Sequence, residues 1–398
     1  MGAPAARAAE LSRHWARMGH DVQVLTGFPN HPTGVVPLEW RGRLRRLFYR
    51  ETVDEVHVTR TWLWPLPNRK SHERIRNYAS FWLSASIGGL RLDKPDVVIG
   101  TSPQLLVALA GWWLAWCKRV PFVFEVRDLW PESLAAVGVG GESSLLHRTL
   151  GAIAGFLYRR SAHIVVVTPA FKEHIVRYWS VPEQKVSMVE NGVETDLFRP
   201  DVPHRAAGTD GRFLICYIGT MGMAHGLETL ISAAEILQQS LPQAMFLLIG
   251  EGAEKEHIVR MARDRGLTNI SFLDQQPREE IPGFIAGADL CLVMLKRTEL
   301  FKTVIPTKLL EYMACARPVL IAVDGQARQV VEDANAGVFV EPEDSRALAD
   351  AVVALASRPD LREQMGRNGR QYIVENLSRE KTARQYVKVL SSMIAPQD

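Results

Sequence analysis

The sequence of 398 residues lacks the patterns that most often mark a metal centre or a disulfide framework. It has no Asp-x-Asp pair, no His/Cys cluster with ligand spacing, and only four cysteines, which are scattered among apolar residues. These absences disfavour metal-dependent catalysis and favour a reducing compartment, with the cytosol as the default. No signal peptide is visible, and the longest strongly apolar run, Leu105 to Cys117, is too short to span a bilayer.

Charge and tryptophan are distributed unevenly along the chain. The net charge of +3 combines residues 1–200, with 25 basic and 18 acidic side chains, and residues 201–398, with 22 and 26. All ten tryptophans lie between Trp15 and Trp179. This asymmetry is expected if the first half faces an anionic membrane surface and the second binds a soluble nucleotide. The alternative is that the tryptophans fill the first core.

Apolar, β-rich runs alternate with helical patterns, which is typical of doubly wound α/β domains. The expected strands are residues 22–25, 56–59, 97–100, 122–126, 163–168, 213–218, 245–249, 270–273, 290–295 and 319–322. The length and the 47% of hydrophobic residues suffice for two cores, and the polar segment from Pro200 to Arg212 is the expected linker. We therefore predict domains at residues 1–200 and 201–377. A final helix within 378–398 either closes the second domain or crosses to the first.

Residues 305–320 predict a proline-opened helix with one acid among apolar residues, followed at once by a strand. Pro306 suits a first helical turn, and Lys308 and Glu311, three residues apart, share one helical face. The free amides at the helix start, from Thr307 onward, suit a phosphate, and the Glu311 carboxylate can accept hydrogen bonds from ribose hydroxyls. The helix is thus predicted to hold a nucleotide diphosphate. The alternatives are a solvated Lys308 and a solvent-facing Glu311.

Residues 217–227 predict a glycine-rich loop between a strand and a helix. Backbone around Gly219, Gly222 and Gly226 can approach a phosphate closely, although the glycine spacing is not that of the dinucleotide fingerprint. His225, at the end of the loop, either contacts the phosphate or packs against the loop.

These blocks resemble the retaining glycosyltransferases of family 4, which have two Rossmann-like domains facing across a cleft, the GT-B arrangement. The resemblance rests on four segments, which are residues 311–314 (Glu-Tyr-Met-Ala), 217–227, 191–200 and 125–132. The order Pro306-Thr307-Lys308 is similar to the branch that builds bacterial surface polysaccharides, of the O-antigen, capsule or colanic acid type. Of the family's Glu-x7-Glu motif, Glu311 fits the second acid, but Thr303 stands at the first.

The resemblance implies that residues 201–377 bind a nucleotide-sugar and residues 1–200 bind the acceptor. The expected donor is UDP-linked, with an N-acetylated amino sugar, and the expected acceptor is lipid-linked or a growing saccharide. In many relatives an Arg and a Lys of the glycine loop meet the diphosphate, and here Thr220 and His225 stand at those places. Lys308 is therefore the expected main cation. No metal or other cofactor is expected.

Asp128 and Arg127 follow the expected strand 122–126, and doubly wound folds place ligands at such carboxyl ends. Asp128 is the predicted catalytic or acceptor-orienting group. Relatives frequently carry His at the position of Arg127. We expect Arg127 to act through its positive charge more than by proton transfer. The alternative is an Arg–Asp pair that braces the loop. Residues 130–132 are expected to shape the acceptor pocket.

The segment 41–50 has five arginines and no acid, with Leu44, Leu47 and Phe48 at helical spacing. A basic amphipathic stretch of this kind predicts contact with the inner face of an anionic membrane, as expected for a peripheral protein. The alternatives are a solvated face and nucleic-acid binding, but no recognised nucleic-acid motif accompanies the charge.

The sequence thus predicts a retaining glycosyltransferase of surface polysaccharide synthesis. An epimerase with the same architecture and a non-catalytic partner of an assembly complex are the alternatives. The first helical pattern, from Gly2 to about Gly19, has no strand before it, whereas relatives usually begin with one. We therefore expect the native protein to carry one more strand and loop upstream of Met1.

Overall fold

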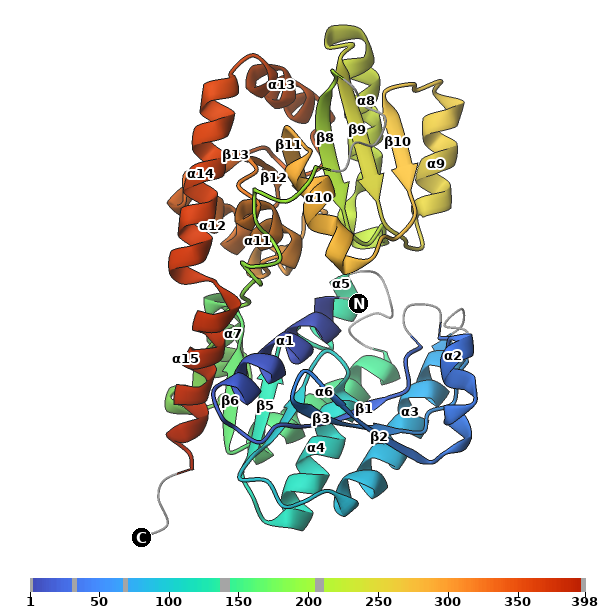
Figure 1. Cartoon of the computed structure of the whole chain (residues 1–398), viewed down its shortest axis with the longest axis vertical. Coiled ribbons are helices and arrows are strands. Elements are labelled where there is room, and N and C mark those ends of the chain that lie inside the picture. The colour runs from blue at the N-terminus through green and yellow to red at the C-terminus, as the bar shows by residue number, and fades with distance from the viewer. Residues whose placement is uncertain (1–2, 31–33, 67–70, 137–143, 205–210, 395–398) are drawn as a thin grey trace. The chain divides into compact units, whose positions relative to one another are not determined.

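The structure, a computed structural model, describes residues 3–30, 34–66, 71–136, 144–204 and 211–394, which form two compact α/β units (Figure 1). We call Gly2–Glu190 together with Thr382–Asp398 the N-terminal unit, and Asn191–Lys381 the C-terminal unit. The division after Glu190 lies before the expected boundary at residue 200. Its physical reason is that Val193 and Phe198 are buried in the core of the C-terminal unit.

The described strands of the N-terminal unit form two sheets. In the first, β1 and β3 are parallel and β2 is antiparallel to β3, whereas the second sheet is parallel throughout. The strands, in sheet order, are β1 (Gln23–Gly27), β3 (Val56–Thr61) and β2 (Phe48–Val53), and then β4 (Val98–Thr101), β5 (Phe122–Val126), β6 (His163–Val166) and β7 (Val186–Met188). Every residue of β5 is buried, as expected for a strand inside a parallel sheet.

Helices and short 3-10 turns accompany these strands. They are α1 (Ala3–Arg17), α2 (Leu38–Arg41), η1 (Arg43–Arg45), α3 (Ser71–Gly88), η2 (Gly89–Arg91), α4 (Leu105–Lys118), α5 (Glu132–Ala136), α6 (Leu145–Arg160), α7 (Pro169–Tyr178) and η3 (Glu183–Lys185). The start of α7 follows directly from the sequence. The Thr168 hydroxyl caps the helix by accepting a hydrogen bond from the Phe171 amide, and Pro169 is the first helical residue. No helix within the described ranges combines the length and apolarity needed to cross a bilayer.

The prediction of a helical amphipathic stretch at 41–50 is wrong. This segment contains the end of α2, the turn η1 and the start of β2. Phe48–Val53 instead pairs with Val56–Thr61, because Asp54 and Glu55 both adopt positive φ, 49° and 67°, as a tight two-residue hairpin requires.

The C-terminal unit is built on one six-stranded parallel sheet. Its order is β10 (Ile270–Leu273), β9 (Ala244–Ile249), β8 (Phe213–Ile218), β11 (Leu290–Met294), β12 (Val319–Ala322) and β13 (Gly337–Phe339). The strand order reverses between β8 and β11. In doubly wound sheets, ligands bind outside the carboxyl ends of the strands at such a switch point.

Helices cover both faces of this sheet. They are η4 (Met223–His225), α8 (Leu227–Ser240), α9 (Lys255–Asp264), η5 (Arg278–Glu280), α10 (Ile281–Ala286), η6 (Phe301–Thr303), α11 (Thr307–Ala314), α12 (Gln326–Asp333), α13 (Ser345–Ala356) and α14 (Pro359–Asn376). Alternate residues of β8 enter two buried clusters, Cys216 with α11 and Tyr217 with α8, because successive side chains of a strand point to opposite faces.

The last helix, α15 (Arg379–Ser391), begins in the C-terminal unit, and from Thr382 its residues belong to the N-terminal unit. There the ring of Tyr386 meets the edge of Trp15 at 5.2 Å, and the Trp15 indole donates to the Ala383 carbonyl. Ala383 and Tyr386 lie in one buried cluster with Val123 and Val165 of the parallel sheet. The end of the chain is therefore part of the first core.

A buried ion pair ties α1 to β5. The Arg7 guanidinium lies 3.0 Å from the Glu125 carboxylate, and both side chains are less than one tenth exposed. Thr101 donates to the same carboxylate, and Arg127 lies 3.6 Å from it. Burial alone raises the pKa of Glu125, but Arg7, Arg127 and the Thr101 hydrogen bond outweigh burial and hold that pKa below its usual value.

We predict that Arg7→Met lowers the free energy of unfolding by about 3 to 5 kcal/mol, because it leaves a buried carboxylate without its main partner. Urea denaturation measures this loss. Arg13→Met is the matched control, since Arg13 lies on the same helix and pairs with Asp54 at the surface. Equal losses in the two variants would contradict the prediction.

Candidate active site

The glycine loop begins where β8 ends, at the switch point of the sheet. The Gly219 amide donates to the Ile249 carbonyl, and a Cβ atom at Gly219 would lie 2.8 Å from the Lys308 ammonium nitrogen. The φ of Gly219 is +140°, which residues with a side chain rarely adopt, so glycine suits this position. Thr220 is exposed, Gly222 precedes η4, and Gly226 precedes α8.

A second loop, which follows β9, packs against the glycine loop. Gly250 has a φ of +149°, and a Cβ atom there would lie 2.0 Å from the Gly219 carbonyl oxygen. The Met221 amide donates to the Glu251 carbonyl, and the Glu254 amide donates to the Met221 carbonyl. The sequence analysis missed this support, although Gly250-Glu251-Gly252 directly after an apolar strand is a usable signal.

The helix α11 starts at Thr307, so Pro306 precedes the helix as its N-cap, with a φ of −61° and a ψ of 131°. The expectation that Pro306 lies in the first turn is therefore wrong by one position. Tyr312 is buried, and its hydroxyl accepts from the Ile218 amide at 2.8 Å. This bond fixes the helix to the last residue of β8, directly before the glycine loop.

Lys308 points its ammonium group at the ring of Tyr217, 3.7 Å from the ring centroid. The nitrogen is buried and has no hydrogen-bond partner among the described residues. Burial lowers the pKa of Lys308 to about 7, and the nearby Glu311 carboxylate opposes this only in part. A buried, unpaired ammonium group is costly, and an anion beside it would remove that cost.

His225 packs against the loop and carries no charge near neutral pH. Burial, followed by the charge of Lys308, lowers the pKa of His225 to about 3. Its Nδ1 lies 3.2 Å from the Gly222 carbonyl oxygen, and its ring meets the edge of the Tyr217 ring at 6.2 Å. Gly219, His225 and Lys308 thus gather around one aromatic ring.

Glu311 forms an ion pair with Arg278, whose Nη1 donates to the carboxylate at 2.9 Å, and both side chains are mostly buried. The Arg278 guanidinium also lies over the Phe198 ring at 4.9 Å. Arg278 thereby holds the position of the Glu311 carboxylate. The sequence analysis missed Arg278, which stands in a polar run without any motif.

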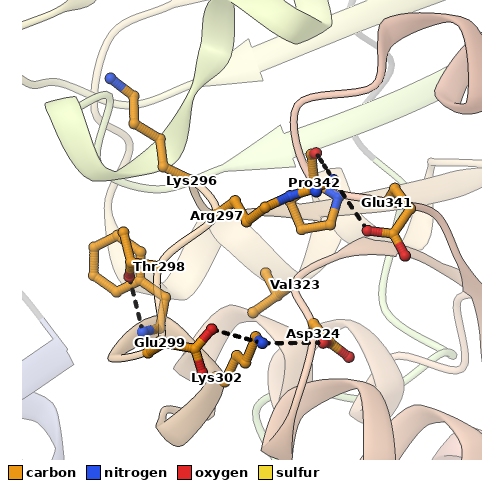
Figure 2. A pocket seen from close by; sticks show the side chains of 10 residues that line it. Lys296, Arg297, Thr298, Glu299, Lys302, Val323, Asp324, Glu341 and Pro342 are labelled. Atoms are coloured by element: carbon orange, nitrogen blue, oxygen red, sulfur yellow. Dashed lines mark hydrogen bonds and ion pairs between the residues drawn. The ribbon is translucent and has the colours of Figure 1, made fainter.

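A cavity of about 140 Å³ opens beside the segment that joins β11 to α11 (Figure 2). Lys302 pairs across it with Glu299 at 2.8 Å and with Asp324 at 3.9 Å. Lys296 also lines it, and its side chain extends away from these ion pairs, with its Cγ atom 3.3 Å from the Cβ position of Gly226. Lys296, a second missed residue, thus connects the cavity to the glycine loop.

Thr303 lies in η6, where its hydroxyl donates to the Leu300 carbonyl at 2.6 Å. A neutral hydroxyl with a local backbone partner therefore stands where the family motif has its first acid. The structure also brings Glu228, Glu254 and His257 together, with ligand atoms within 4.8 Å of one another, as one group able to hold a metal.

Asp128 and Arg127 belong to the N-terminal unit. Burial raises the pKa of Asp128, although hydrogen bonds from Ser133 and Trp130 to its carboxylate act in the opposite direction. The Arg127 guanidinium donates to the Ser102 carbonyl at 3.0 Å and faces Glu125. Arg127 is thus held by the network around Glu125.

Residues 130–132 lead from this loop into α5, and the carboxylate of Glu132, the first residue of α5, lies 3.1 Å from the His174 Nε2 atom of α7. Burial tends to raise the pKa of Glu132, but the His174 hydrogen bond, a backbone hydrogen bond and the nearby His174 and His147 together outweigh burial, and the pKa is lowered. The loop that carries Asp128 is therefore braced at both ends.

Comparisons with known proteins account for both units. Residues 2–192 match the family described as glycosyl transferase 4-like domain, and residues 203–372 match glycosyl transferases group 1. The putative colanic acid biosynthesis glycosyl transferase WcaI of Escherichia coli K12 is 26% identical over 95% of this chain and 93% of its own length.

Solved structures share the fold. Sucrose-phosphate synthase from Thermosynechococcus elongatus aligns with a TM-score of 0.75 at 19% identity, over 98% of this chain and 93% of that one. The Anabaena protein HepE, in complex with UDP and glucose, aligns with a TM-score of 0.69 at 16% identity, over 94% of this chain and 100% of that one. The protein belongs to family 4 of the glycosyltransferases and has their GT-B fold of two Rossmann-like domains.

Proposed function

We propose that this glycosyltransferase takes a sugar from a UDP-linked donor and transfers it, with retention of configuration, to a lipid-linked or growing saccharide in bacterial surface polysaccharide synthesis. The observation that carries the proposal is the buried, unpartnered ammonium group of Lys308 at the start of α11, against the glycine loop. WcaI, named for colanic acid biosynthesis, and HepE, solved with UDP, support the pathway and the nucleotide.

The diphosphate would lie between the glycine-loop amides and the first turn of α11. Backbone N–H groups and the positive end of a helix favour an anion there, and Lys308 adds a full charge once the anion raises its pKa again. Glu311, positioned by Arg278, would accept hydrogen bonds from the ribose hydroxyls. The cavity between Lys296 and Lys302 would receive the donor sugar, for which an N-acetylated amino sugar stays the expectation.

For the chemical step, charge develops on the leaving diphosphate and must be stabilised in place. Lys308 and the loop amides would stabilise it, so that the diphosphate oxygen can take the acceptor proton without a covalent enzyme intermediate. Asp128, desolvated at the carboxyl end of β5, would orient the acceptor hydroxyl. Arg127 would brace this loop through Ser102 and Glu125.

The acceptor and the compartment follow from the same proposal. A lipid-linked acceptor requires the protein to work as a peripheral protein at the cytoplasmic face of the cell membrane. We also propose that transfer needs no metal or other cofactor.

The hydroxyl of Thr303 in place of the first motif acid favours one second candidate, a nucleotide-sugar binder without transferase activity.

We predict that one class of sugar nucleotide stabilises the protein by about 2.7 kcal/mol at a hundred times its dissociation constant. Thermal unfolding against a panel of UDP- and GDP-sugars identifies the class. Transfer to saccharide acceptors, with product anomers assigned by NMR and EDTA in a parallel reaction, then tests the chemistry. Binding without transfer would identify the binder, an isomerised donor would identify an epimerase, and EDTA inhibition would contradict metal independence.

We predict that Lys308→Met stabilises the ligand-free protein by about 1 to 3 kcal/mol at pH 6, because it removes a buried, unpaired charge. The pKa of Lys308 is lower in the folded chain than in the unfolded chain, so the unfolded chain binds more protons between about pH 7 and pH 10.5. Wild-type stability therefore rises with pH across this window, and the advantage of the variant shrinks. Urea denaturation at several pH values measures both trends.

The same variant is expected to lower turnover more than nucleotide affinity, because the charge matters most as the diphosphate departs. Lys172→Met, which removes a surface lysine paired with Glu183, is the control for both experiments. A destabilised Lys308→Met protein, or equal losses of turnover and affinity, would contradict the assignment.

We predict that Glu311→Ala weakens UDP binding by about tenfold to a hundredfold, the loss expected for a charge-assisted hydrogen bond to ribose. Calorimetry with UDP and 2′-deoxy-UDP separates this contact from general damage, because the variant loses its preference between the two nucleotides. Glu332→Ala, which breaks a surface pair with Arg328, is the control. Unchanged UDP affinity in the folded variant would refute the ribose assignment.

A further inference from the structure

Large apolar side chains are exposed on α3, η2 and α4, which contact one another in the N-terminal unit. On α3 and η2, Leu83, Ile87 and Leu90 follow one another at helical spacing, and Leu83 is 56% exposed. On α4, Trp113 and Trp116 lie with their ring centroids 5.3 Å apart, and Trp116 is 63% exposed. Scattered single exposed apolar residues are normal, but a cluster of this size marks an interaction site.

These side chains come from elements that pack together. Helices α3 and α4 are in contact, and a Cβ atom at Gly89 would lie 2.3 Å from Leu114 of α4. The Lys118 ammonium group donates to the Leu92 carbonyl at 2.6 Å and to the Leu90 carbonyl at 3.5 Å. The last turn of α4, which carries Trp116, is thus fastened to the segment that carries Leu90.

The charges around these side chains are mainly basic, although Asp93 and Asp96 lie exposed directly after Leu92. Residues 74–92 and 97–124 contain no acid at all. They contain five basic residues, which are Arg74, Arg76, Arg91, Lys118 and Arg119. On α4 itself, the exposed residues are the two tryptophans. Apolar and aromatic side chains with a mainly basic surround complement an anionic phospholipid surface, where indole rings settle at the headgroup level.

We propose that this α3–α4 surface, made of Leu83, Ile87, Leu90, Trp113 and Trp116 with the basic residues around them, docks the N-terminal unit on an anionic phospholipid membrane. The inference rests on the proposed function, which places the acceptor in a membrane. The surface replaces the segment 41–50 as the main contact. In that segment Arg43 lies over the Trp40 ring at 4.8 Å, and the Arg41 guanidinium donates to the Val36 carbonyl.

The apolar side chains would enter the headgroup region while the arginines and lysines remain level with the phosphates. Binding then depends on both contributions, since amphipathic surfaces hold to bilayers by buried apolar area and by attraction to anionic lipid. Removing either the apolar cluster or the negative lipid is therefore expected to release the protein.

The test is co-sedimentation of the full chain with vesicles of phosphatidylethanolamine and phosphatidylglycerol, and with vesicles of phosphatidylcholine alone. We expect wild type to bind the anionic vesicles. The variant Leu83→Gln/Ile87→Gln/Trp116→Gln is expected to partition about tenfold or more weakly. Leu361→Gln/Val374→Gln, which changes exposed apolar residues of the C-terminal unit, and Arg41→Gln/Arg43→Gln/Arg46→Gln are expected to retain most of the binding.

A second measurement does not depend on the triple variant folding. Brominated lipid is expected to quench wild-type tryptophan fluorescence, and Trp116→Phe is expected to remove a large share of that quenching. The proposal is overturned if wild type ignores anionic vesicles, or if the 41–50 variant is released while the α3–α4 variant stays bound. It is also overturned if sedimentation velocity shows that the surface joins two copies of the chain. UDP affinity, measured for every variant, reports separately on the proposed function.

Discussion

The desolvated charge of Lys308 is the constraint around which the C-terminal unit is built. Its ammonium group sits over Tyr217, and the backbone beside it is that of Gly219, whose φ of +140° residues with a side chain rarely adopt. The same charge helps to keep His225 neutral. Such a charge persists only where the surrounding packing is strong enough to hold it, and the buried residues of α11 and β8 supply that packing. This buried ammonium group without a hydrogen-bond partner is the feature on which the proposed diphosphate site rests.

In the N-terminal unit, by contrast, the buried charge has partners within the protein. Glu125 is matched by Arg7, Arg127 and Thr101, so its carboxylate is satisfied without any ligand. A satisfied network of this kind fixes the position of a segment, here the loop that begins at Arg127. An unsatisfied charge draws a partner from outside. The two units thus show a structural use and a binding use of the same chemistry.

The sequence predicted the fold class well and the edges of the sheets poorly. The expected strands 122–126, 213–218 and 319–322 coincide with β5, β8 and β12, because buried parallel strands are short apolar runs between turn signals. The expected strand 270–273 coincides with β10, which is only partly buried. The strands β2, β7 and β13 were not predicted, because they lack a continuous apolar run. The hairpin before β3 was unexpected because its turn uses Asp54 and Glu55 instead of a glycine.

The candidate site divides in a similar way. Lys308 and Glu311 were visible because both lie on one short helix, where spacing alone sets their relation. Arg278 was not visible, because the fold brings it to Glu311 across 33 positions of sequence. Lys296 reaches Gly226 from the segment after β11 for the same reason. Local spacing reveals residues of one element, whereas partners from different elements require the topology.

The helix α15 carries a consequence for biosynthesis. The first core contains Ala383 and Tyr386 beside Leu11 and Val123, so its parts are separated by almost the whole sequence. During translation the segment up to residue 190 leaves the ribosome long before residues 382–391 do. The N-terminal unit must therefore wait, with part of its core uncovered, until the C-terminal unit has been synthesised. The unit that begins to fold first is thus completed last. A nascent chain that stalls after the N-terminal segment and before α15 would be a natural substrate for chaperones.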